Sequence, residues 1–84
     1  MAKINAELQE QIKSLSSKRF DLIVRTDGDA TAYAAWCQEE GIEVKQQFRL
    51  SPGLAVTCSG EAALKLLDQA WVKSVELDKS VTIL

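Results

Sequence analysis

Histidine is missing from the 84 residues, and cysteine occurs only twice. Without histidine, neither a Ser-His-Asp nor a Cys-His catalytic set can form, and a zinc site lacks its usual nitrogen ligands and enough thiolates. We therefore expect no enzyme activity, no metal and no cofactor. Cys37 and Cys58 stand far apart in apolar surroundings and form no Cys-x-x-Cys pair, which favours two reduced, shielded thiols over a disulfide or a redox role.

Long apolar runs are also missing. No stretch approaches the roughly 18 consecutive apolar residues that a membrane span requires, and the polar start is unlike a secretory signal. We expect a cytoplasmic protein with no membrane partner, although a mature exported product would look the same. The net charge of −2 makes nucleic acid a poor partner, and one proline and four glycines leave a chain that can fold throughout.

What the sequence does contain is a regular alternation of helical and strand-like segments. A helix is predicted over 5–17, capped by Asn5, with an apolar stripe of Ile4, Leu8, Ile12 and Leu15. The segments that follow are a strand at 20–26, a helix from 29 to 40, a hairpin of strands at 43–50 and 54–58, a helix at 59–70, and a strand at 71–77. The inward residues of the first strand are expected to be Phe20, Leu22 and Val24. We expect Asp29 to cap the helix that follows, Gly41 to end it, and Tyr33, Trp36 and Cys37 to form a stripe on one side. The inward residues of the helix at 59–70 are expected to be Ala63, Leu64, Leu67 and Ala70.

From Phe20 the order is β-α-β-β-α-β, which predicts an α+β, ferredoxin-like fold: one antiparallel four-stranded sheet with two helices on one face. We divide the chain into an N-terminal helix and connector (1–19), this domain (20–78) and an extended C-terminal tail (79–84).

Alternation along the hairpin assigns side chains to the two faces of the sheet. The inward residues are expected to be Val44, Phe48, Leu54 and Val56. The residues expected on the open face are Lys45, Gln47, Arg49, Ala55 and Thr57. By this alternation Gln46 would also face inward, and it is the one polar residue that breaks the apolar pattern of the inward positions. The open face then carries no aromatic residue on which RNA bases could stack.

The second half of the chain resembles the subtilisin propeptide and protease-inhibitor family. The resemblance lies in the segments Gly53-Leu54-Ala55-Val56-Thr57-Cys58 and Glu61-Ala62-Ala63-Leu64-Lys65-Leu66-Leu67, and in a final Val-x-x-Val-Glu-x-Asp signature formed by Val72, Val75, Glu76 and Asp78. It implies a non-enzymatic inhibitor, or a propeptide-like folding partner, of a subtilisin-like serine protease. The open sheet face would bind the enzyme.

Two sets of site residues are implied by this resemblance. Glu76 and Asp78 are similar to the family acids that cap the N-termini of two surface helices on the protease, where N–H groups are unpaired. The tail would lie in the active-site cleft as a product-like strand, formed by Val81, Thr82, Ile83 and Leu84. Leu84 would fill the first specificity pocket and Val81 the fourth.

A different function stays open beside this one. A ferredoxin-like regulatory or assembly module could dimerise through its open face or its N-terminal helix. The stripe of Ile4, Leu8, Ile12 and Leu15 separates the two hypotheses, because an exposed stripe favours self-association or another partner and a packed one is only structural. Within the inhibitor hypothesis, a free-standing inhibitor and an excised propeptide are both open, and the target protease is not identified.

Overall fold

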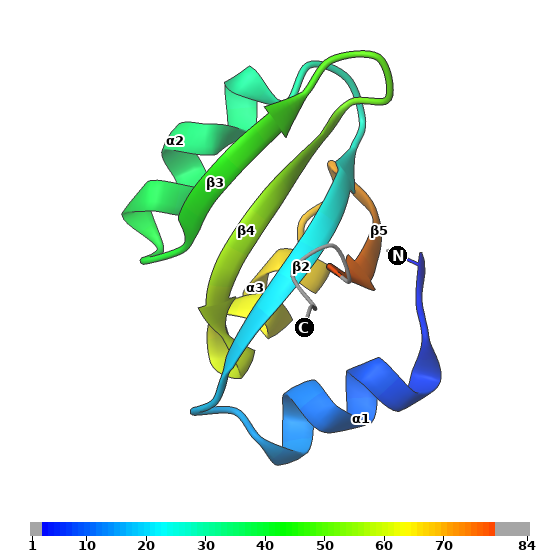
Figure 1. Ribbon diagram of the computed structural model, residues 1–84, viewed down its shortest axis with the longest axis vertical. Coiled ribbons are helices and arrows are strands. Elements are labelled where there is room, and N and C mark those ends of the chain that lie inside the picture. The colour runs from blue at the N-terminus through cyan, green and yellow to red at the C-terminus, as the bar shows by residue number, and fades with distance from the viewer. Residues whose placement is uncertain (1–2, 79–84) are drawn as a thin grey trace, which may run out of the picture.

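The computed structural model describes residues 3–78 of the chain, which form three helices and one five-stranded, mixed, open sheet (Figure 1). The protein is therefore an α+β protein. Its elements are β1 (Lys3–Ile4), α1 (Ala6–Ser14), β2 (Arg19–Thr26), α2 (Thr31–Glu39), β3 (Glu43–Phe48), β4 (Gly53–Ser59), α3 (Gly60–Leu67) and β5 (Val72–Leu77).

The strands lie in the order β1-β5-β2-β4-β3. Strand β1 runs parallel to β5, and the other three neighbouring pairs are antiparallel. The predicted four-stranded sheet is corrected to five strands, because β1 has two residues and is too short to show any alternation in sequence. Ile4 was predicted to belong to the helical stripe. Instead it lies in β1, pairs with Val75 of β5, and packs against the core from that strand.

The N-terminal helix begins where the sequence predicts and ends earlier. The Asn5 side-chain oxygen accepts the backbone N–H groups of Glu7, at 2.8 Å, and Leu8, at 3.3 Å, as an N-cap does. The helix α1 ends at Ser14 instead of residue 17, and the Leu15 side chain after it is 45% exposed. Only Leu8 and Ile12 of the predicted stripe are buried within the helix.

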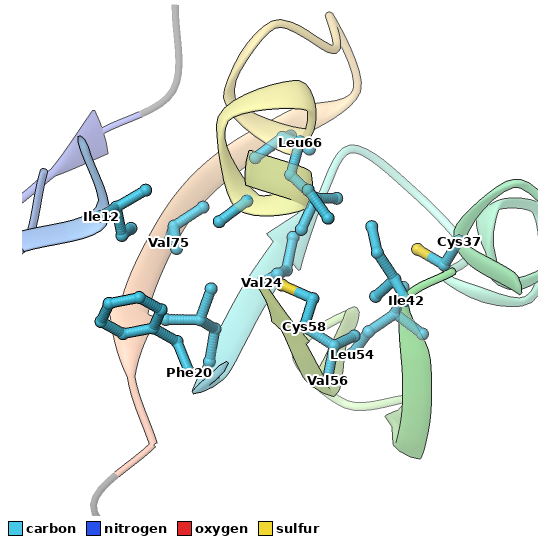
Figure 2. Packing of buried hydrophobic residues seen from close by; sticks show 14 of the residues in the cluster. Ile12, Phe20, Val24, Cys37, Ile42, Leu54, Val56, Cys58, Leu66 and Val75 are labelled. Carbon is cyan, nitrogen blue, oxygen red and sulfur yellow. The ribbon is translucent and has the colours of Figure 1, made fainter. Parts of the chain in front are cut away.

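Helix α1 packs against α3 on the apolar side of the sheet. A Cβ atom at Gly60 would lie 2.6 Å from the carbonyl oxygen of Ile12, so only glycine allows this approach of the two backbones. Ile12 joins a cluster with Phe20, Leu66 and Val75 (Figure 2). Helix α1 shares this core with α3 and flanks the opposite face only as far as the hollow described below, which its residues line together with Ile23 and Glu76.

Helix α2 starts at Thr31, two residues after the predicted cap. The Asp29 carboxylate accepts the Thr31 N–H at 2.9 Å, and Ala30 occupies the cap position. Gly41, with φ of +77°, follows the helix as predicted, since few other residues adopt that conformation. The Tyr33 ring stacks on Trp71 with centroids 4.3 Å apart, so the aromatic stripe of α2 packs against the start of β5.

Helix α3 buries a different set of side chains from the predicted one. The Ser59 hydroxyl caps it by accepting the N–H of Ala62 at 3.2 Å. The buried residues are Gly60, Ala62, Ala63 and Leu66, whereas the expectation was Ala63, Leu64, Leu67 and Ala70. Leu64 and Leu67 are half-buried because α1 covers the flank of α3.

A β-bulge in β3 changes which side chains face the core. Val44 lies opposite Val56 and Gln46 lies opposite Ala55, so Lys45 is the extra residue. Gln46 therefore faces outward with Ala55, which explains its break in the alternation of the sequence. Beyond the bulge the parity of the strand is reversed.

Two predicted orientations are wrong because of this bulge. Gln47, expected outward, pairs with inward-facing Leu54 and accepts a hydrogen bond from the Thr31 hydroxyl of α2 at 3.0 Å. Phe48, expected in the core, lies on the open face, where its ring centroid is 5.4 Å from the Arg25 guanidinium carbon. The open face thus carries one aromatic ring, contrary to the expectation of none.

Candidate functional site

The candidate site is the sheet face opposite the helices, which we call the open face. In Figure 1, α2 and α3 lie behind the sheet and the broad face of β4 and β2 is turned to the viewer. The strand registers arrange its side chains in three rows. The first row pairs Asp21 with Thr57 and Thr57 with Glu43, and the Lys45 side chain reaches Asp21 from the β3 bulge. The second row holds Ile23, Gln46, Ala55 and Glu76, and the third holds Lys3, Arg25, Phe48, Gly53 and Ser74.

The first row is a polar chain that crosses the sheet. The Thr57 hydroxyl of β4 donates a hydrogen bond to the Asp21 carboxylate of β2, and the Lys45 ammonium of β3 lies 3.0 Å from the same oxygen. The Lys45 ammonium also lies 3.8 Å from a carboxylate oxygen of Asp78, which follows β5. These contacts join all four antiparallel strands at one end of the open face.

The charge of this row is balanced locally. The hydrogen bond from Thr57, together with that from Lys45, holds the pKa of the Asp21 carboxyl below its usual value. Asp21 is therefore ionised at neutral pH, and Lys45 is its counterion. Because the Asp21 side chain is still 42% exposed, the row remains accessible to a partner from the solvent side.

The two acids predicted to contact a protease occupy different environments. Glu76 is exposed in the second row, opposite Ile23 of β2. Asp78 has a side chain only 7% exposed, lies beside Lys45, and donates its backbone N–H to the Asp21 carbonyl at 2.9 Å. Glu76 is therefore available to a partner, whereas the carboxylate of Asp78 is engaged within the domain.

The other predicted face residues are brought together only in part. Lys45 and Thr57 lie side by side on the open face, and Ala55 forms its floor at 3% exposure. Gln47 faces α2 instead, as described above. Arg49 lies outside β3, in the turn that follows it, where it lines a hollow with Asp29.

A hollow of about 590 Å³ adjoins Glu76 at the end of β5. Its lining residues are Asn5, Glu7, Leu8, Gln11, Ile23, Glu76 and Leu77. The carboxylates of Glu7 and Glu76 make the hollow acidic, and the side chains of Leu8 and Leu77 make part of its wall apolar. Such a surface suits a partner that presents N–H donors next to apolar groups.

The two thiols lie on the opposite side of the sheet, where they are shielded from solvent. Cys37 and Cys58 are unpaired and have no solvent exposure. Burial raises the pKa of each thiol to about 11. Both are therefore protonated at neutral pH, as expected for shielded core cysteines, and neither is a thiolate nucleophile.

The tail residues Val81, Thr82, Ile83 and Leu84 lie outside the described residues. Among residues 3–78, no helix has the length and apolar character needed to cross a bilayer. No protein-family model matches this chain, and none of the curated proteins matches it in sequence.

Proposed function

We propose that this protein is an inhibitor, or propeptide-like folding partner, of a subtilisin-like serine protease in the cytoplasm, and that the open face is its binding surface. One observation carries the proposal: α1 packs with α3 through Leu8 and Ile12, and Glu76 stays exposed on the open face beside the hollow that α1 flanks. A protease that docks on a sheet needs such a face to be free.

The strand arrangement supports a ferredoxin-like domain within residues 20–78. Strands β5, β2, β4 and β3 are neighbours in that order and are antiparallel throughout, and α2 and α3 are inserted as in a β-α-β-β-α-β unit. Val72 and Val75 of the signature are buried, while Glu76 is exposed. The signature therefore presents one acid to a partner and anchors itself with two valines.

The geometry changes the roles that the resemblance implies for the two acids. Exposed Glu76 is the residue that accepts N–H groups at a helix N-terminus of the enzyme, an interaction worth about 0.5–2 kcal/mol. Asp78 holds Lys45 and the backbone of β2, and so fixes where the chain leaves the sheet. The tail from Val81 to Leu84 then enters the active-site cleft as an added strand.

For the alternative, a ferredoxin-like regulatory or assembly module, dimerisation through the N-terminal helix receives less support than dimerisation through the open face. Leu8 and Ile12 are buried in the protein's own core, and Leu15 is the exposed member of the stripe. A single exposed leucine makes a small apolar surface, and isolated apolar residues are ordinary on protein surfaces. The packing of α1 thus favours a structural role for this helix.

A titration of the full chain against a panel of subtilisin-like proteases tests the proposal. We expect inhibition of at least one enzyme, and weaker inhibition by at least about tenfold when Ile83 and Leu84 are removed, since burying one leucine contributes about 1.5–3 kcal/mol. Melting temperatures of the two proteins should agree. Equal inhibition by the full and the shortened chain would contradict the product-like mode of binding.

A further inference from the structure

The third row of the open face ends in a hollow lined by three cationic side chains. Lys3 of β1, Arg25 of β2 and Lys73 of β5 line it together with Thr26, Ser51, Pro52 and Ser74. Its volume of about 360 Å³ falls at the lower end of the roughly 300–1,000 Å³ that small-ligand clefts occupy. No acidic residue is among these lining residues.

The sheet register brings the three cations together. Ser74 of β5 is paired with Lys3 on one side and with Arg25 on the other, so the two cations flank it. A second bulge makes Lys73 an extra residue, because Arg25 lies opposite Ser74 and Thr26 lies opposite Val72. The bulge lets Lys73 line the same hollow as its neighbour Ser74.

Residues 3–78 supply no ion-pair partner for this cluster. None of the ion pairs within residues 3–78 involves Lys3, Arg25 or Lys73. The acids nearest along the chain are Asp27, next to Thr26, and Glu76, which lines the acidic hollow instead. Three like charges on adjacent strand positions repel one another. They lack carboxylate partners within residues 3–78 even though acidic residues outnumber basic ones in this chain of net charge −2.

Arg25 is held in place for recognition. One of its guanidinium nitrogens donates to the Ser51 carbonyl at 2.9 Å, and the guanidinium lies over the Phe48 ring. These contacts use part of the five N–H donors of arginine and fix the plane of the group. The hollow therefore offers the other N–H donors of Arg25, two lysine ammonium groups, and the hydroxyls of Ser51 and Ser74. This set suits a ligand with several acceptor oxygens.

We propose that this hollow is a binding site for a small polyanion of the phosphate type, such as a diphosphate. Charge and donor geometry favour phosphate oxygens, which accept charge-assisted hydrogen bonds from arginine and lysine. This inference goes beyond the inhibitor function. The site lies at the opposite end of the open face from Asp21 and Asp78, and binding is measured without a protease, so either conclusion can fail alone.

The test is a calorimetric and NMR titration of the full chain with inorganic pyrophosphate. We expect a dissociation constant of about 1 mM or tighter, with backbone shift changes centred on Lys3, Arg25, Lys73 and Ser74. The double variant Lys3→Gln/Lys73→Gln should bind at least about tenfold more weakly, since two charge-assisted contacts are lost. Both side chains belong to exposed residues, so this variant should fold normally.

The matched control is Lys13→Gln/Lys18→Gln, which changes the net charge equally at exposed residues that do not line this hollow. It should retain wild-type affinity within about twofold, apart from a weak, screened field effect. The proposal is overturned if the control loses as much affinity as the Lys3/Lys73 variant, if that variant binds like wild type, or if the wild-type protein does not bind pyrophosphate.

Discussion

The two faces of the sheet differ in the burial and the chemistry of their side chains. On the covered face, Leu22, Val24, Leu54 and Val56 have no solvent exposure and pack against all three described helices. On the open face, acids, lysines and one aromatic ring are half-buried or exposed and interact mainly with each other. The stability of the fold should therefore reside in one face, which leaves the other free to serve recognition.

The largest expected effect compares neighbouring residues of β2 that point to opposite faces. Leu22→Ala should lower the free energy of unfolding by about 2–5 kcal/mol, because it opens a cavity in a fully packed site. Ile23→Ala, on the open face and half-buried, should cost only about 1 kcal/mol. Urea unfolding of both variants measures the difference, and equal losses would mean that the open face is part of the core.

The buried thiols predict a loss of stability at alkaline pH. The pKa of each thiol is raised to about 11 in the folded protein, against a reference of 9.0 for an unfolded chain. Stability from the protonated thiols is thus complete below pH 9 and is lost between pH 9 and 11. The loss should be on the order of 2 kcal/mol per thiol.

Chemical unfolding measured between pH 8 and pH 10.5 checks this prediction. In a Cys37→Ala/Cys58→Ala variant the alkaline decline should become shallower, even though the variant is less stable at neutral pH. Bulky thiol reagents should label the native protein slowly at neutral pH, at a rate limited by opening of the core. Rapid labelling would show that one of the thiols is exposed on the covered side.

The polar row on the open face should contribute least to stability. Asp21→Asn should lower the free energy of unfolding by at most about 1 kcal/mol at neutral pH, since the ion pair with Lys45 is exposed. The pKa of Asp21 is below its reference of 3.8 in the folded protein, so its contribution is present above pH 3.8 and is lost as the pH falls through the lower folded value.

Asp27→Asn is the control for this measurement, because the Asp27 side chain is exposed and makes no ion pair or hydrogen bond within residues 3–78. Acid unfolding curves of the two variants should differ only in the region where Asp21 titrates. A loss of several kcal/mol in Asp21→Asn would show that the polar row holds the fold together.

The covered face was the more predictable of the two. Alternation in β2 and β4 assigned the inward residues correctly, and Asn5 and Gly41 marked where α1 begins and where α2 ends. These signals are local, because a cap or a left-handed glycine depends on adjacent backbone atoms. The two-residue strand β1 gave no such signal, since it exists only through its pairing with β5.

Which side chains lie on the open face depends on features that the alternation of the sequence does not reveal. The bulge at Lys45 exchanged the faces of Gln47 and Phe48, and the only hint was the misplaced Gln46. The engagement of Asp78 by Lys45 joins residues far apart in the chain. Bulges and cross-strand ion pairs are set by tertiary register, so the composition of the open face could be predicted only in part.

The inhibition constants of two glutamine variants test the central claim most directly. Gln46 is exposed on the open face, and Gln38 is exposed on α2, on the other side of the sheet. Against a susceptible subtilisin-like protease, Gln46→Arg should weaken inhibition by at least about tenfold through steric and charge mismatch, while Gln38→Arg should stay within about twofold of wild type. If Gln38→Arg weakens inhibition and Gln46→Arg does not, the open face is not the binding surface.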